Sequence, residues 1–328
     1  MDNPVNERAS GDWQIATERD IYYCYRLFLD REPDADGWTT YASNIKTGMS
    51  VQSLVASFLN SVEFRNRQSA QSAVESTPLL VEAETFKIYV APSGSPVASP
   101  IIEGRPYEPH VVAAIRRLLK PGMVFVDVGA SIGYLSLVAA HEVGKEGKVI
   151  CFEPDLYNCK LLYLSAKANG FANVEIYPFA IADTSRNVIF DSMQGNGVIS
   201  DFDVNLESTP MRFVVRAMSL DQVLRDEESI HLLKMDVEGA EYMVLRGAAN
   251  MLKQHRPVII SEFSPAGLRN VSGVSGEEFL RLLVDDGYNL SVLGFDTEVI
   301  DCGDNIEKVL RYQSEMLTSH IDIAAIPK

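Results

Sequence analysis

The stretch VFVDVGASIGYLSL, residues 124–137, decides how the rest of this 328-residue chain is organised. Its apolar first half is typical of a strand that is buried on both faces of a parallel sheet, with Asp127 as the one charged residue. Gly129 and Gly133 bracket a turn where the backbone can approach a ligand closely, and Ser131 is predicted to cap the helix that follows. A strand, a glycine turn and a helix N-terminus together form a cradle for a nucleotide cofactor.

Strands and helices alternate along the chain after this stretch. The predicted core strands are short apolar runs at 148–152, 174–179, 232–235 and 258–260. The predicted helices cover 156–168, 242–254 and 277–285. Antiparallel additions are expected at 188–190 and 213–215, and the tail should supply two last antiparallel strands. This alternation implies an α/β fold with a doubly wound, mostly parallel sheet.

The N-terminal part has a different pattern. Residues 1–16 are polar and predict a disordered tail, whereas residues 17–67 carry apolar positions at three- and four-residue spacing and predict a small all-helical module. Residues 68–78 have the composition of a linker, so residues 79–328 form the α/β domain. The piece YRLFLDREPDADGWTTYASNIKTGMSVQSLVASFLNSVEF resembles a bacterial helical module of unsettled role, marked by R-x-P-D-x-x-G. This resemblance implies a docking or self-association unit, because the module offers no cluster of reactive side chains.

Composition excludes several kinds of partner and site. The formal net charge of −16 and a pI near 4.8 disfavour nucleic acid or an anionic membrane, because both bind clustered Lys and Arg. No apolar run has membrane-spanning length, so we expect no membrane insertion and a soluble, cytoplasmic protein. The four cysteines form no close pair and are predicted to be buried thiols. The five histidines are scattered, which argues against a zinc site.

The glycine spacing distinguishes between two classes of cofactor. Dinucleotide folds use G-x-G-x-x-G, whose middle glycine lets the backbone reach the pyrophosphate. This chain has Gly129-Ala130-Ser131-Ile132-Gly133 instead, which makes a dehydrogenase improbable. S-adenosylmethionine fits the turn, because Asp127 could hold its ammonium group, directly or through water, and the turn N–H groups could hold its carboxylate.

The next strand end supports a nucleoside ligand. Glu153 follows a short apolar strand about twenty residues after the turn, where a carboxylate can accept both ribose hydroxyls. Pro154 offers an apolar surface for adenine, and Ala180 could close the other side. Asp183 is a candidate partner of the adenine amino group.

Four motifs resemble the FkbM-type methyltransferase family. They are VDVGASIGYLSL, CFEPDLYN, FAIAD and HLLKMDVEGAEYMVLRGA, followed by PVIISEF, and the match covers roughly residues 108–263. The resemblance implies a class I fold that uses S-adenosylmethionine and, in known members, usually modifies a hydroxyl of a sugar or polyketide-type product. By similarity the glycine turn, Asp127 and Glu153 bind the cofactor, and Glu108 contacts its methionine end. Ser131 stands where Asn is commoner in the family.

Three charged residues end the fourth core strand. Lys234, Asp236 and Glu238 occupy alternate positions and can project towards one side, at the edge where ligands bind. A carboxylate there could act as general base on a hydroxyl; Asp236 is the first candidate and Glu238 the second. The alternative is that both only cap the following helix. Two or three neighbouring carboxylates could also hold Mg²⁺, and the sequence does not decide this. Glu262, at the end of the fifth strand, could be a third acid on this rim.

The sequence therefore predicts an S-adenosylmethionine-dependent O-methyltransferase acting on a sugar, glycan or polyketide-type small molecule. Its alternative is an interaction protein that binds the cofactor without turnover and recruits partners, or itself, through residues 17–67. Cofactor binding that is followed by no methyl transfer would favour that alternative.

Overall fold

The computed structural model describes residues 15–29, 31–59, 61, 63–64, 77–92, 97–193, 196–200, 212–316 and 318–328. Most of the predicted tail, most of the linker and most of the segment 195–205 lie outside these residues. Among the described helices, none is long and apolar enough to cross a membrane.

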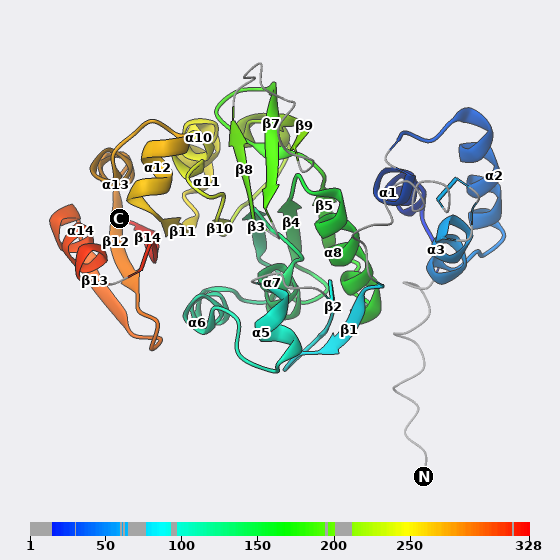
Figure 1. Cartoon of the computed structure of the whole chain (residues 1–328), viewed down its shortest axis with the longest axis horizontal. Coiled ribbons are helices and arrows are strands. Elements are labelled where there is room, and N and C mark those ends of the chain that lie inside the picture. The colour runs from blue at the N-terminus through cyan, green and yellow to red at the C-terminus, as the bar shows by residue number, and fades with distance from the viewer. Residues whose placement is uncertain are drawn as a thin grey trace, which may run out of the picture.

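An eight-stranded sheet forms the centre of the larger domain (Figure 1). Its spatial order is β13-β12-β14-β11-β10-β3-β4-β5. The strands are β3 (Val124–Val128), β4 (Lys148–Phe152), β5 (Val174–Tyr177), β10 (Leu232–Met235), β11 (Val258–Phe263), β12 (Tyr288–Leu293), β13 (Val299–Gly303) and β14 (Ile321–Pro327). The five strands from β5 to β11 are parallel, and β14 runs antiparallel to both of its neighbours. The predicted α/β fold with a doubly wound, mostly parallel sheet is confirmed.

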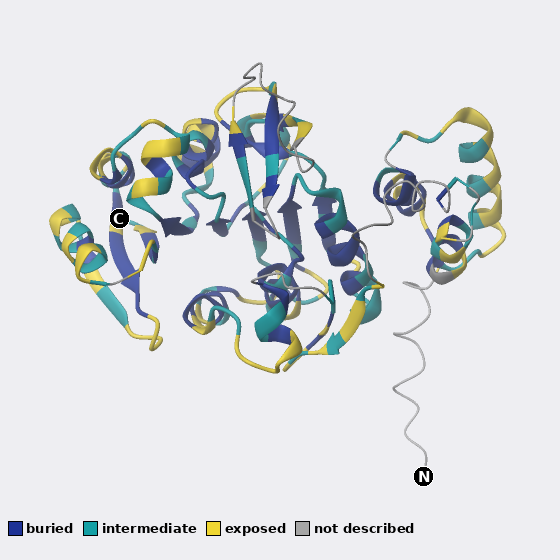
Figure 2. Cartoon of the chain, in the orientation of Figure 1, coloured by how far each residue is buried: buried dark blue, intermediate teal, exposed yellow. Residues whose placement is uncertain are grey.

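Helices cover both faces of this sheet because its strands bury alternate side chains in two separate cores. Phe125 points into one core and Val126 into the other. The first core is covered by the hairpin β1 (Leu79–Glu82) and β2 (Lys87–Val90), and by α5 (Ala98–Ile102), α6 (Pro109–Leu118), α7 (Tyr134–Val143) and α8 (Leu156–Asn169). The second is covered by α9 (Leu220–Val223), α10 (Glu241–Arg246), α11 (Ala249–His255), α12 (Pro265–Val271), α13 (Gly276–Asp285) and α14 (Ile306–Glu315). Figure 2 shows the buried residues concentrated on the strands between these layers.

A smaller sheet confirms the predicted antiparallel additions. It contains β6 (Ala180–Ile181), β7 (Arg186–Met193), β8 (Asn196–Ser200) and β9 (Arg212–Met218), in the order β6-β9-β7-β8. β7 pairs antiparallel with both β8 and β9. Because β6 follows β5 after two residues, this sheet begins at the carboxyl edge of the central sheet.

One local prediction was wrong. The tail contains three strands and α14, not two strands alone, because β13 adds to the outer edge of β12. Near the N-terminus, the Asp34 carboxylate accepts the Gly37 N–H and begins a helix at Ala35.

The N-terminal helices α1 (Glu18–Leu29), α2 (Ala35–Lys46) and α3 (Val51–Leu59) dock through α1 against α8 and β5. The Tyr23 hydroxyl accepts the Ile176 N–H at 3.1 Å, on the outer edge of β5. Asp20 pairs with Lys167 of α8 at 2.6 Å. The module thus covers an edge strand that would otherwise expose unpaired backbone groups.

Close backbone packing joins the ends of β3 and β10. The Asp236 N–H donates to the Val128 carbonyl at 3.0 Å. At Gly129, whose φ is +80°, a Cβ atom would lie 1.9 Å from the Asp236 carbonyl oxygen. A side chain is therefore excluded here by contact as well as by backbone conformation.

Comparing Gly129→Ala with Gly122→Ala separates these two effects. Gly122 has a φ of +83° and open space around it, so Ala there should cost only about 1–2 kcal/mol of unfolding free energy. Gly129→Ala must also displace the Asp236 carbonyl, and we expect at least twice that loss. Urea unfolding of both variants tests this; equal losses would contradict it.

Candidate functional site

Polar side chains gather where the parallel strands end. The carboxyl ends of β3, β4, β10 and β11 meet at one edge, where the antiparallel β14 begins. Lys234 lies opposite Asp127 in the register of β10 and β3, and Glu262 lies opposite Asp322 in that of β11 and β14. All four alternate with residues of the second core, so they lie on the face covered by α6 and α7.

Lys234 is the buried cation of this row. Its Nζ lies 3.2 Å from Oδ2 of Asp236 and 3.8 Å from Oδ1 of Asp127, and the residue is only 5% exposed. Burial opposes the charge of Lys234, but the carboxylates of Asp236 and Asp127 outweigh it and raise its pKa. The Ser136 hydroxyl of α7 donates to Asp127, which is fully buried. The structure therefore places Asp127 beneath the edge, in contact with Lys234.

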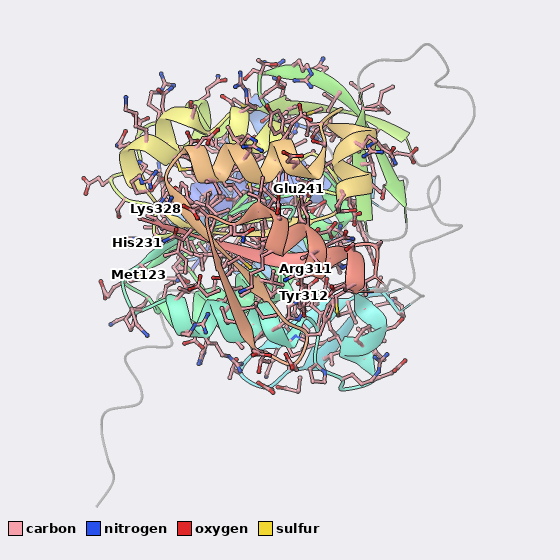
Figure 3. All side chains as sticks on the ribbon, turned by 90° about the vertical axis from the view of Figure 1, so that its left-hand side faces the viewer. Met123, His231, Glu241, Arg311, Tyr312 and Lys328 are labelled. Atoms are coloured by element: carbon pink, nitrogen blue, oxygen red, sulfur yellow. The ribbon has the colours of Figure 1, made fainter. Side chains whose placement is uncertain are left out.

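A tight turn follows β10 and presents Glu238. Glu238 has a φ of +55° and Gly239 a φ of +100°. Oε1 of Glu241 accepts the N–H groups of Val237 and Gly239 at 2.9 and 3.3 Å, so this carboxylate holds the turn together. Burial raises the pKa of Glu241 to about 7. Figure 3 shows Glu241 well away from His231, which precedes the other end of β10.

Three carboxylates converge at the edge between β10 and β11. One oxygen each of Asp236, Glu238 and Glu262 lies within 4.8 Å of the others. Burial raises the pKa of Glu262, and the negative charges of Asp236 and Glu241 raise it further. The group consists of carboxylates alone.

The start of α6 lies over this same edge of the sheet. Glu108 has a φ of +42°, and burial raises the pKa of its carboxyl to about 7, with Lys234 opposing and Asp236 adding to the rise. Nε2 of His110 lies 2.7 Å from Oδ2 of Asp322, and both residues are largely buried. The sequence reasoning did not identify His110 or Asp322. No local pattern indicates this pair, because the two residues lie 212 positions apart in the sequence.

Glu153 supports the glycine turn. Its Oε2 accepts the Ser131 N–H at 2.8 Å, and its Oε1 accepts the Asp155 N–H at 2.9 Å. Burial and the neighbouring Asp155 charge raise the pKa of Glu153 to about 8. The carboxylate thus lies next to the turn, where the sequence predicted a ligand-binding acid.

The prediction that Ser131 caps α7 was wrong. The helix begins at Tyr134 after Gly133, and Gly133 is its N-cap without a side-chain hydrogen bond. Ser131 lies earlier in the turn with a φ of +50°, and its buried hydroxyl has no hydrogen-bond partner. Gly133 is required by packing, because a Cβ there would lie 2.1 Å from the Leu162 side chain.

A small pocket, partly open to solvent, lies beside the glycine turn on the opposite face of the sheet. Its walls are mainly apolar and come from the ends of β3 and β4, the small sheet and the turn after β10: Val128, Gly129, Phe152, Pro154, Ala180, Ile181, Ile199, Val237 and Ala240. Three predicted cofactor residues, Gly129, Pro154 and Ala180, are among them. Ala130 is buried in the turn, and its N–H donates to the Phe152 carbonyl.

Asp183, the predicted partner of the adenine amino group, is paired with a basic side chain. Its carboxylate pairs with Arg186 of β7 and does not line this pocket. The four cysteines are buried and free, as predicted. His231 accepts the Val124 N–H through Nδ1 at 3.0 Å, at the edge of the sheet opposite to the site.

The chain is similar to three individual proteins. The chain is 26% identical over 255 residues to the methyltransferase sdnD of Sordaria araneosa, covering 67% of this chain and 92% of that protein. It is 13% identical to the crystal structure of methyltransferase FkbM from Methylobacillus flagellatus, with a TM-score of 0.39 over 96% of this chain and 60% of that one. A TehB-like methyltransferase structure from Corynebacterium glutamicum is 10% identical, with a TM-score of 0.38 over 70% of this chain and 94% of that one.

Two family models match separate parts of the sequence. A domain of unknown function, DUF4214, matches residues 7–68, which include α1 to α3. The methyltransferase FkbM domain matches residues 127–290, from the end of β3 into β12, and this range holds the glycine turn, Glu153 and the acids after β10 and β11. The chain therefore belongs to the FkbM methyltransferase family.

Proposed function

We propose that this chain transfers a methyl group from S-adenosylmethionine to a hydroxyl group of a sugar, glycan or polyketide-type small molecule. The family makes it an S-adenosylmethionine-dependent methyltransferase. The observation that carries the hydroxyl assignment is the group of carboxylates beside the glycine turn, because a hydroxyl acceptor must lose a proton during transfer.

The cofactor would lie across the carboxyl edge of β3 and β4. Its adenine would lie against the apolar residues around Pro154 and Ala180, and its ribose hydroxyls would donate to Glu153. The amino-acid end would then extend past the glycine turn towards Glu108. Ala130, Ser131 and Gly133 shape that turn in this proposal, whereas Asp127 acts on the ligand through Lys234. Asp183 is the weakest member of the set, since Arg186 holds its carboxylate.

Asp236 is our first candidate for the general base. Its carboxylate stays partly exposed, and Lys234 donates to one of its oxygens at 3.2 Å. This contact holds the carboxylate in place at the end of β10, where a base would act on the acceptor hydroxyl. Glu238 is the second candidate. Methyl transfer itself is an in-line displacement that requires the acceptor oxygen to be held close to the methyl carbon.

The competing interaction-protein hypothesis is not favoured, because the family consists of methyltransferases. Docking or self-association through residues 17–67 and a cytoplasmic location stay predictions. Titration calorimetry with S-adenosylmethionine and NAD, followed by mass spectrometry of methylated glycans and metabolites, tests the main proposal. Absence of binding to S-adenosylmethionine would overturn it, and transfer to nitrogen or carbon alone would overturn the hydroxyl assignment.

Replacing Asp236 by Asn should reduce turnover by about 10²- to 10⁴-fold, because the amide cannot accept the hydroxyl proton. The Kd for S-adenosylmethionine should change less than about threefold, because Asp236 does not hold the cofactor in this proposal. Asp285→Asn, an exposed change on α13, is the matched control and should leave both quantities unchanged. Equal losses of turnover and cofactor affinity in Asp236→Asn would contradict this division of roles.

Glu153→Gln should have the reverse effect. The amide keeps the size of the side chain but loses one acceptor for the ribose hydroxyls, so the Kd should rise about tenfold or more. Turnover at saturating cofactor should fall much less. Calorimetry and steady-state kinetics on the same preparation separate the two quantities, and a loss confined to turnover would show that Glu153 does not hold the ribose.

The raised pKa of Glu153 also predicts a pH dependence of stability. Its folded-state pKa of about 8 lies above the usual value of 4.5, so the ionised form destabilises the fold without cofactor. The contribution of protonated Glu153 to the unfolding free energy should be fully present below about pH 4.5 and should be lost as the pH rises through about 8. Between pH 5 and 8 the wild type should lose roughly 1–3 kcal/mol more unfolding free energy than Glu153→Gln. Urea unfolding at both pH values measures this, and parallel losses would refute it.

A further inference from the structure

We propose that Asp236, Glu238 and Glu262 form a binding site for one hard divalent cation, Mg²⁺, at the edge between β10 and β11. The site itself depends only on these carboxylates. Its consequence for catalysis rests on the proposed methylation of a hydroxyl.

The geometry suits a single ion. One carboxylate oxygen from each residue lies within 4.8 Å of the other two. Hard cations bind oxygen at about 2.0–2.6 Å, so one ion placed among these atoms reaches all three after small side-chain movements. The arrangement is built into the sheet, because Met235 and Ser261 are register partners and Asp236 and Glu262 follow them on adjacent strands.

Glu262 provides a second, independent observation. It is 9% exposed, and no described residue gives its carboxylate a hydrogen bond or an ion pair. Both basic side chains of the row are engaged elsewhere, since Lys234 pairs with Asp236 and Asp127, and His110 contacts Asp322. A largely buried carboxylate with no donor beside it is a suitable ligand for a cation.

Glu241 supports the same site from below. Its Oε1 holds the N–H groups on both sides of Glu238, while its Oε2 is buried without a hydrogen-bond partner. This contact fixes the turn that presents Glu238 before any ion arrives. Groups that hold a ligand in place typically contribute 10- to 100-fold to metal affinity.

The donor set favours Mg²⁺ over zinc or other soft ions. The cluster found among the described residues contains carboxylates and neither His nor Cys. Carboxylates with water completing the shell are the ligands that Mg²⁺ and Mn²⁺ prefer. Lys234 donates to Oδ2 of Asp236, which leaves the other oxygen for the ion.

A cation here would lie where the acceptor hydroxyl must approach Asp236. It would lower the pKa of that hydroxyl, so that a weaker base could remove the proton. Metal binding and the hydroxyl chemistry can be tested separately, because the ion should bind without cofactor or acceptor.

The test uses the full chain, metal-free, with Mn²⁺ as a paramagnetic probe. Loss of the free Mn²⁺ signal should show one ion per chain, displaced by Mg²⁺. Glu262→Gln should weaken binding roughly 10- to 100-fold. Glu307→Gln, an exposed acid at the start of α14, is the matched control and should bind as the wild type does.

The outcomes are distinct. No stoichiometric Mn²⁺ binding, or binding that Glu262→Gln leaves unchanged, would overturn the proposal. Glu238→Gln gives a second measurement if the Glu262 variant fails to fold, and it should also weaken binding at least tenfold relative to the control. S-adenosylmethionine binding is also measured in the presence of a metal chelator, which tests the proposed function without the metal. A failed metal site and a failed methyltransferase assignment therefore give different results.

Discussion

The buried ion pairs of Lys234 are the interaction on which the rest of the site depends. Lys234 lies between Asp127 at the end of β3 and Asp236 at the end of β10, with its ammonium almost fully removed from water. A buried charge is tolerated only with close partners, so each of the three residues constrains the other two. This requirement links the strand that carries the glycine turn to the strand that carries the candidate base.

Backbone contact sets the spacing across the same junction. The Asp236 carbonyl occupies the space that a side chain at Gly129 would fill, and the Asp236 N–H bonds to the Val128 carbonyl. The two strand ends therefore approach more closely than side chains would permit. Glu153 then holds the far side of the turn through the Ser131 N–H. In the proposed function, this packing fixes the distance between the methyl donor and the base.

An excess of carboxylates over cations distinguishes this edge from an ordinary ion-pair network. Burial raises the pKa values of Glu108, Glu241 and Glu262, and neighbouring carboxylates add to the rise. The edge therefore holds more carboxylates than cations that could neutralise them. The sulfonium of the cofactor and the proposed Mg²⁺ would both relieve this excess. Affinity for positive ligands thus follows from the same burial of carboxylates.

The sequence by itself determined the α/β fold, the glycine turn, Glu153 and the acids after β10, because strand periodicity and glycine placement are local signals. It missed His110 and Asp322, which are far apart in the chain and meet only because α6 packs over the start of β14. It misplaced the start of α7, since the Ser131 backbone is bound by Glu153 across the sheet. Only the tertiary structure decided that Asp127 is buried under Lys234 and that Glu262 joins Asp236 and Glu238, because register and burial depend on contacts between distant strands.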